Sequence, residues 1–434
     1  MQPKKYLTII VINLGIFIAS GSLSQAQSTE SPYTNKLEKL EKENQDLRHR
    51  LDALEDMAKK EGLLRSGSNT DPPVSAMSEI TLSGFVTASY FHDSSEPPAS
   101  IGHKSPGYLW NRVNDSFTLN KVKITLASPP IQNNGDKFDA AFRVSLIAGQ
   151  DAPIVNSGSG TTGFDLLREA YVDLNIPIGT GLDVRAGELI SLLNYESGDG
   201  GAANANFSQG YQWFFTGNGP AAGVQVGYNL TDWLDVKFRA QNGLYAGPVD
   251  NNSSKTFVGA IGIKPTKTLW FSLLGFGGRE DAFAQSLWGA SLLGGWQATE
   301  QLSFGTELDY FNFHNAQASV GSLPGSVSQP GDSPVWSTGL WITYDFTKQI
   351  GLAVRGEFLS DVDGVDASNG ALGFRNPLGT GQDLTSVALT LNYKPVPTIK
   401  IQPEVRFDHT SWSGGFVPGK QNRVFYGAGA SYLF

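Results

Sequence analysis

Charged side chains at every second position are the feature of this chain most suited to chemistry. In the segment 234–241, LDVKFRAQ, Asp235, Lys237 and Arg239 alternate with apolar residues, and a period of two places the two sets on opposite faces of a strand. Acids and bases that face each other across water create a transverse field, which filters solutes by charge and dipole. For any one such residue, the alternative is a solvated or ion-paired wall position. We predict that the following residues line a pore: Arg143, Glu169, Asp173, Asp183, Arg185, Asp235, Lys237, Arg239, Glu307, Asp309, Arg355, Glu357, Lys400, Glu404, Arg406 and Asp408.

A second group of candidates lies in the longest polar stretch between apolar segments, residues 190–220, ISLLNYESGDGGAANANFSQGYQWFFTGNGP. We predict that this stretch folds into the pore as a constriction. Aromatic faces with nearby acids suit sugars and other neutral polar solutes. The alternative is that the WFF triplet packs onto the wall as an anchor. The predicted contact groups are Tyr195, Glu196, Asp199, Tyr211, Trp213, Phe214 and Phe215.

Metal and catalytic motifs are weak. The segment SDVDGVDASNG offers Asp361, Asp363 and Asp366 as a calcium candidate, but it lacks EF-hand spacing, and an ordinary external loop is the alternative. No other cofactor is expected. The absence of cysteine excludes disulfides and thiol catalysis. The histidines are scattered and none belongs to a recognisable Ser or Asp constellation, so we expect no enzyme: His49, His92, His103, His314 and His409.

The elements that would position these residues are strands. Alternating segments bounded by turn residues begin near Ile80, Phe117, Phe138, Leu166, Leu182, Ala221, Leu234, Thr256, Leu269, Leu287, Leu302, Trp336, Ile350, Leu384, Ile399 and Val424. Short turns such as PIGTG and ATEQ alternate with long stretches at 92–116, 150–165, 190–220, 246–255, 277–285, 315–335, 361–383 and 411–422. This alternation is typical of an up-and-down barrel with tight turns on the periplasmic side. An even strand number leaves both ends of the barrel on one side.

A soluble sandwich or propeller is the alternative fold, and three observations favour a membrane barrel. The N-terminus resembles a secretion signal, and the polar face carries too much charge to pack against a second sheet. Aromatic residues also recur near strand ends, as an interfacial girdle requires. Open edges are forbidden in hydrocarbon, so the sheet must close and the last strand must abut the first. The predicted girdle residues are Tyr90, Phe91, Trp296, Trp336, Tyr344, Phe346 and Tyr393.

The predicted fold class is therefore all-β: a 16-stranded antiparallel up-and-down transmembrane β-barrel over residues 79–434, in contact with outer-membrane lipid. A short N-terminal α-helical coiled coil is expected to precede it. In the final segment, RVFYGAGASYLF, one set of alternate residues is apolar throughout and would face lipid, with Phe434 at the interface. The net charge of −9 argues against nucleic acid as a partner.

The residues before the barrel divide into three predicted parts. Residues 1–26 form a signal peptide, with Lys4 and Lys5 before an apolar core and SQA as the cleavage site, although a short membrane anchor is the alternative. Residues 27–65 form a periplasmic coiled-coil helix, and 66–78 are a polar linker with two prolines.

The coiled coil is predicted from a narrow apolar seam on alternating steps of three and four. We predict that it joins copies of the chain into a homo-oligomer, a trimer in preference to a dimer. The seam itself does not distinguish two strands from three, and a single amphipathic helix on the periplasmic rim is the alternative. The seam residues are Leu37, Leu40, Asn44, Leu47, Leu51 and Leu54.

Two features resemble known families. The ending aromatic-x-aromatic, Tyr432 and Phe434, resembles the assembly signal of bacterial outer-membrane barrels. The segments FDLLREAYVDLNIPIGTGLDVRAGEL and NFSQGYQWFFTGNGPAAGVQVGYNLTDWLDVKFRAQNG resemble the OmpL-like beta-barrel porin family, and the resemblance extends over most of 79–434. It implies a porin-like outer-membrane channel without defined catalytic residues. The Leu-rich stalk resembles the periplasmic coiled coils of some other porins.

The function expected from these observations is passive diffusion of small hydrophilic solutes through a water-filled channel in the bacterial outer membrane, with the stalk in the periplasm. One alternative is a structural anchor tethered through the coiled coil. Another is a channel selective for sugars or phosphate.

Overall fold

The computed structural model describes residues 80–109, 111–132, 135–157, 165–217, 219–244, 249–250, 252–280, 284–317, 328–365 and 380–434. The chain divides into two units, Met1–Ser78 and Glu79–Phe434. The first unit lies outside the described residues. The signal peptide, the coiled coil with its seam from Leu37 to Leu54, and the linker therefore stay predictions.

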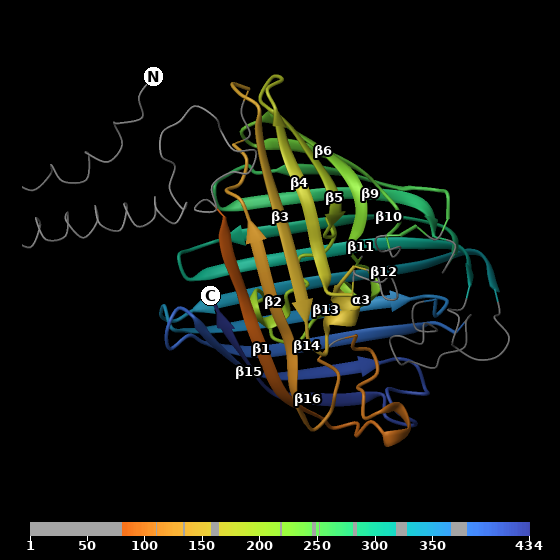
Figure 1. The fold of residues 1–434 in the computed structure, drawn as a ribbon. Coiled ribbons are helices and arrows are strands. Elements are labelled where there is room, and N and C mark those ends of the chain that lie inside the picture. Colours follow the sequence, from red (N-terminus) through yellow and green to blue (C-terminus); the bar gives the residue numbers. More distant parts are fainter. Residues whose placement is uncertain are drawn as a thin grey trace, which may run out of the picture. The chain divides into compact units, whose positions relative to one another are not determined.

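The second unit is a closed barrel in which every strand pairs antiparallel with its neighbours in the chain, and β1 also pairs with β16 (Figure 1). The strands are β1 (Thr81–Asp93), β2 (Ser116–Ala127), β3 (Asp139–Ala148), β4 (Leu167–Ile176), β5 (Leu182–Leu189), β6 (Ala221–Thr231), β7 (Leu234–Gln241), β8 (Thr256–Ile263), β9 (Leu269–Glu280), β10 (Ala284–Gln297), β11 (Leu302–Gln317), β12 (Ser328–Asp345), β13 (Ile350–Asp361), β14 (Gln382–Tyr393), β15 (Ile399–Thr410) and β16 (Asn422–Leu433). The predicted fold class, with its sixteen strands, is confirmed.

The last residue, Phe434, adds one more pair to the contact between β1 and β16 that closes the barrel. The backbone N–H of Phe434 donates to the carbonyl of Gly84 at 3.0 Å, and the N–H of Gly84 donates back to Phe434 at 2.8 Å. A Cβ on Gly84 would lie 2.1 Å from the carbonyl oxygen of Lys123 on β2, so only glycine fits between the two neighbouring strands. The chain end is thus a paired strand, and no sheet edge is left open at this seam.

The alternation of side chains sorts the wall into two faces. Phe238 is 55% exposed while its neighbour Arg239 is 3% exposed, and Phe407 and Arg406 show the same contrast. Apolar residues therefore point outward to the membrane, and charged residues point into the barrel. Six of the predicted girdle aromatics are exposed, but Phe91 is buried and stacks on Phe425 with ring centroids 4.6 Å apart. The prediction for Phe91 was wrong because consecutive residues of a strand point to opposite faces, and Tyr90 takes the outer one.

Two loops are shorter than predicted. Strand β9 runs to Glu280 and β10 starts at Ala284, so both strands extend into the long stretch expected at 277–285. Strand β12 begins at Ser328, eight positions before the predicted Trp336. Outside the membrane both faces of a strand meet water, so backbone pairing continues after the apolar alternation has ended. The exposed pair His314 and Asp332, 2.9 Å apart across β11 and β12, lies in such an extension.

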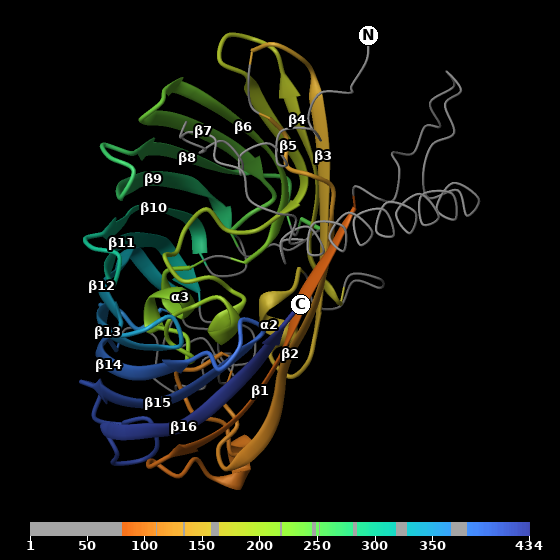
Figure 2. The same ribbon diagram turned by 90° about the vertical axis from the view of Figure 1, so that its left-hand side faces the viewer.

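Short helices occupy the loops that join the strands at their outer ends: η2 (Ala99–Ile101), α2 (Ala152–Val155), η3 (Gly200–Ala202) and α3 (Tyr211–Phe215). Figure 2 shows the segment with α3 inside the ring of strands, towards β11–β14. Contacts of α3 with β12 and β13, and of η3 with β1 and β16, agree with this position. Within the described part of the chain, no helix has the length and apolar character needed to cross a membrane.

Candidate functional site: the barrel interior

The stretch 190–220, here called the lumen loop, folds into the barrel and is held there by carboxylates of the wall. The backbone N–H of Phe207 donates to Glu404 on β15 at 2.7 Å, and that of Tyr195 donates to Glu307 on β11 at 2.8 Å. Backbone donors facing buried carboxylates make charge-assisted hydrogen bonds, which are stronger than neutral ones. These bonds fix the beginning and the middle of the loop to β11 and β15.

Basic side chains on the same side of the barrel donate hydrogen bonds to backbone carbonyls of the lumen loop. Arg406 donates to the carbonyl of Gln209 at 2.6 Å, and Lys400 donates to that of Gly201 at 2.8 Å. Asp309 on β11 accepts a hydrogen bond from the Thr216 hydroxyl at 2.7 Å. We call the inward face of β11–β16 the covered wall, because its charged side chains are buried and are bonded to the loop or to one another.

Buried ion pairs reinforce this attachment. Glu196 of the lumen loop lies 2.8 Å from Arg355 on β13, which also lies 3.1 Å from Glu357 on the same strand. Trp341 donates its indole N–H to Glu196 at 3.1 Å. All four side chains are buried. Breaking such a pair leaves a charge without compensation in a dry environment, which holds the loop strongly in one position.

Most of the WFF segment packs into the protein. Tyr211 and Phe215 have almost no exposed surface and belong to the main apolar cluster, while Trp213 packs with Ile147 and Val155. The Tyr211 hydroxyl accepts from Arg423 on β16 at 3.1 Å, and burial raises the pKa of this phenol, which keeps it neutral. This arrangement agrees with the anchor interpretation of the segment.

Tyr195 lies at the opposite end of the lumen loop in an aromatic cluster. Its ring centroid is 4.7 Å from that of Trp341 and 6.3 Å from that of Trp270. A Cβ on Gly305 would lie 2.1 Å from the Tyr195 ring, so the missing side chain on β11 makes room for it. Phe214 is partly buried against both apolar clusters.

Asp408 belongs to a separate buried network. It lies 2.7 Å from Arg406 and 2.9 Å from Arg423, and Arg423 lies 3.3 Å from Asp93 on β1. The Tyr108 hydroxyl donates to Asp408, which ties the loop after β1 to the same wall. The predicted pore-lining residues Arg406 and Asp408 therefore hold loops in place and present no surface to water.

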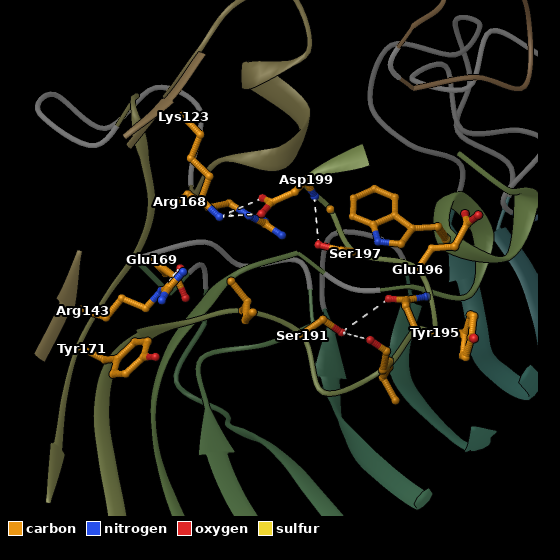
Figure 3. Close-up of a pocket in the computed structure, with 15 residues that line it drawn as sticks. Lys123, Arg143, Arg168, Glu169, Tyr171, Ser191, Tyr195, Glu196, Ser197 and Asp199 are labelled. Atoms are coloured by element: carbon orange, nitrogen blue, oxygen red, sulfur yellow. Dashed lines mark hydrogen bonds and ion pairs between the residues drawn. The ribbon is translucent and has the colours of Figure 1, made fainter. Parts of the chain in front are cut away.

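A cavity of about 400 Å³ remains between the first part of the lumen loop and strands β2–β4 (Figure 3). Lys123 on β2 and Arg168 on β4 point towards Asp199 of the loop, and Lys123 makes hydrogen bonds of 2.7 and 2.9 Å to its two carboxylate oxygens. Arg143 and Tyr171 also line this cavity.

The remaining predicted wall charges lie on this second side. Arg143 on β3 binds Glu169 at 2.7 Å, Arg185 on β5 binds Asp173 at 2.6 Å, and Lys237 on β7 binds Asp235 at 2.5 Å. We call the inward face of β3, β5 and β7 the open wall. Asp183 lies among these pairs, and Arg239 donates to Gln225 and to the carbonyl of Ile190.

Several interior residues were missed by the sequence analysis. Lys121 and Lys123 alternate with Val122 and Ile124 on β2 and could have been found from that pattern. Arg168 could not have been found in this way. Arg168 and Glu169 are consecutive and both buried, whereas strict alternation allows only one of two consecutive residues to point inward. The pairing of β3 with β4 shifts register at this level, which is the local irregularity of a β-bulge.

The calcium candidate is described only in part. Asp361 is buried at the end of β13 and accepts the backbone N–H of Val365 at 2.8 Å. Asp363 follows in the next turn, and Asp366 lies outside the described residues. Within the described ranges no three acidic, histidine or cysteine side chains gather as a metal site would require.

Comparisons with known structures give the same fold. The outer membrane channel DcaP of Acinetobacter baumannii matches with a TM-score of 0.51 and 14% identity, over 82% of this chain and 97% of its own. The anion-selective porin from Comamonas acidovorans has a TM-score of 0.51 and 11% identity, over 82% and 99%. The high pH structure of Pseudomonas putida OprB has a TM-score of 0.50 and 12% identity, over 82% and 94%. At these identities the likeness shows the fold alone.

Sequence comparison adds the family. No curated protein matches the chain. The family model described as "Putative beta-barrel porin-2, OmpL-like" matches residues 79–434, which is the entire barrel. The chain therefore belongs to the OmpL-like β-barrel porin family and is an outer-membrane channel for the passive diffusion of solutes.

Proposed function

We propose that small hydrophilic solutes cross this porin between the lumen loop and the open wall. One observation carries the proposal: at positions from Tyr195 to Thr216 the loop is bonded to the covered wall, and a cavity of about 400 Å³ remains on its other side. Charges that are hydrogen-bonded to a buried loop cannot solvate a passing molecule, whereas partly exposed ones can. Of the predicted lining residues on β3, β5 and β7, the partly exposed Arg143, Arg185 and Lys237 would then act on solutes. Arg239 is buried and bonded to the carbonyl of Ile190, so it belongs with the covered charges.

The lumen loop is proposed as the constriction of this path. Asp199 is its main charged contact group, because Glu196 is turned to the covered wall and bound by Arg355. Tyr211 and Phe215 are too deeply buried to touch a solute, which argues against an aromatic sugar site formed by this part of the loop. We propose a channel without catalysis, as its family membership supports.

We further propose that residues 27–65 form a periplasmic coiled coil that joins three barrels. The direction of the chain supports the periplasmic position, since β1 starts and β16 ends on the side of the short turns, such as the one between β6 and β7. The apolar seam of the stalk supports self-association.

The experiment that tests the channel is current recording with the full-length protein in planar bilayers, together with swelling of liposomes in small sugars. Discrete ohmic steps and sugar entry are expected, because a water-filled path conducts ions and neutral solutes alike. A correctly folded barrel that gives a sealed baseline in both assays would contradict the proposal and favour the structural anchor.

A further inference from the structure

The open wall carries a regular series of basic side chains. Arg143, Arg185 and Lys237 lie on β3, β5 and β7, and strand register sets their heights. Strand β4 lies between β3 and β5. Arg185 pairs with Asp173 of β4, and Arg143 pairs with Tyr171, which is two residues before Asp173 on the same strand. Arg143 and Arg185 therefore lie on successive inward levels of the wall, one level being about 7 Å along a strand.

Lys237 occupies the level nearest the short turns. It pairs with Gly227 on β6, whereas Arg185 pairs with Gln225 on the same strand, two residues away. Gly227 contributes no side chain at that level, and Asp183 of β5 lies 3.6 Å from the position where its Cβ would be. We call Arg143, Arg185 and Lys237 the basic staircase.

Each member of the staircase is more exposed than the acid that holds it. The exposed fractions are 39% for Arg143 against 4% for Glu169, 30% for Arg185 against 9% for Asp173, and 37% for Lys237 against 17% for Asp235. The three pairs are neutral in sum, and the basic member of each presents the larger exposed fraction to water. Asp183, a partly exposed carboxylate on β5, lies on the level of Lys237.

The geometry of the pairs leaves donors for a solute. Arg143 binds Glu169 through Nε, and a guanidinium has five N–H donors, so its exposed end keeps hydrogen-bonding capacity. Arg185 lies over the face of the Tyr171 ring, with its guanidinium carbon 4.5 Å from the ring centre, and this cation–π contact holds it in place. Side chains held in place in this way lose little entropy when they bind an anion.

We propose that the basic staircase is an anion path that binds small oxyanions, the carboxylate or phosphate groups of solutes, and makes this porin anion selective. The inference deepens the proposed function and rests on it. Arginine forks match oxyanions in two-point hydrogen bonds. Successive members lie about 7 Å apart along the strand direction and two strand spacings, about 10 Å, apart across the sheet, so their Cα atoms are about 12 Å from each other. An anion released by one member therefore meets the next one on the same wall.

The test measures reversal potentials of the full-length protein in planar bilayers under a potassium chloride gradient. The wild type should pass chloride in preference to potassium. The triple variant Arg143→Gln, Arg185→Gln, Lys237→Gln should lower that preference at least about threefold, because it uncovers the carboxylates behind the staircase. The control triple Lys264→Gln, Lys267→Gln, Lys348→Gln removes the same charge from exposed turns and should leave the preference nearly unchanged.

A second pair of variants separates charge from hydrogen-bond geometry. Arg143→Lys and Arg185→Lys together should keep chloride selectivity but weaken the block of chloride current by inorganic phosphate and by acetate, because the fork is lost. If the triple glutamine variant does not fold, Lys237→Gln alone should shift selectivity in the same direction.

The outcomes are distinct. Ohmic steps with a preference for potassium, or equal shifts in the staircase and control triples, overturn this inference and leave the channel intact. If phosphate blocks the double lysine variant as strongly as it blocks the wild type, the proposed recognition of oxyanions by the arginine forks is overturned. A folded wild type without current overturns the proposed function itself.

Discussion

Glu196 of the lumen loop and Arg355 of β13 form a buried ion pair, with 2.8 Å between Oε1 and Nη1. The pair joins a segment that crosses the lumen to a strand far away in sequence. Further hydrogen bonds hold both charges: the Trp341 indole donates to Glu196, and Arg355 donates to the Ser208 carbonyl. In the proposed path, the position of the lumen loop, and with it the width of the channel, depends on contacts remote from the open wall.

Replacing Glu196 by Gln should loosen the lumen loop. The substitution leaves Arg355 with less compensation in a dry site, and breaking a buried pair costs about 3–5 kcal/mol. We expect a lower urea midpoint together with larger and noisier current steps. The control Glu300→Gln, in an exposed turn, should change neither. Unchanged steps in the Glu196 variant would show that this pair does not set the constriction.

Replacing Gly305 by Ala should displace Tyr195. The new methyl group would lie 2.1 Å from the Tyr195 ring, and overpacking of this kind costs about 1–3 kcal/mol. Gly356→Ala is the matched control, because no atom lies within 4 Å of the position where its Cβ would be. Thermal unfolding followed by gel mobility should distinguish the two variants, and equal melting temperatures would argue against this close contact.

Tyr211 offers a test of the sugar alternative. Because its ring is buried and its hydroxyl bonds Arg423, Tyr211→Phe should remove one hydrogen bond, worth about 1 kcal/mol, and should not alter the entry of sugars. Liposome swelling with the variant and the wild type measures this directly. Slower sugar entry at unchanged single-channel current would support a sugar-binding site at Tyr211.

Deletion of residues 35–62 tests the stalk. The deletion removes the apolar seam and leaves the barrel. Oligomers should therefore dissociate at a lower detergent concentration or a lower temperature than those of the wild type, while the conductance of each barrel stays the same. Native gels and bilayer recordings on one preparation give both quantities. Oligomers as stable as those of the wild type would exclude the stalk from assembly.

The barrel could be predicted because its signal is local. In β7 and β15, lipid requires apolar residues on one face and the interior admits charged ones on the other, so each strand can be recognised alone. The same rule fails where lipid ends, as in the extension of β12, and where pairing slips, as beside Arg168. Neither the point where lipid ends nor a shift in register between two strands can be recognised from the sequence of one strand alone.

The interior was less predictable, because alternation says which residues point inward but not what they meet there. Arg185 and Arg406 occupy equivalent inward positions in sequence, yet one faces open space and the other bonds the lumen loop. That difference depends on where residues 190–220 lie, which is decided by contacts across the barrel. The sequence singled out this loop, and the structure shows which wall it covers.

The claim that water and solutes follow the open wall is tested most directly by single cysteines, since the natural chain has none. Ser197 lines the cavity and is exposed, whereas Ser386 points inward from β14 and is buried beneath the loop. A bulky charged thiol reagent should reduce the current of the Ser197→Cys channel by about half or more, because the added group narrows the path. It should leave the Ser386→Cys channel and the wild type unchanged. Block at Ser386→Cys, with an unaffected Ser197→Cys channel, would place the path on the other wall and contradict this account.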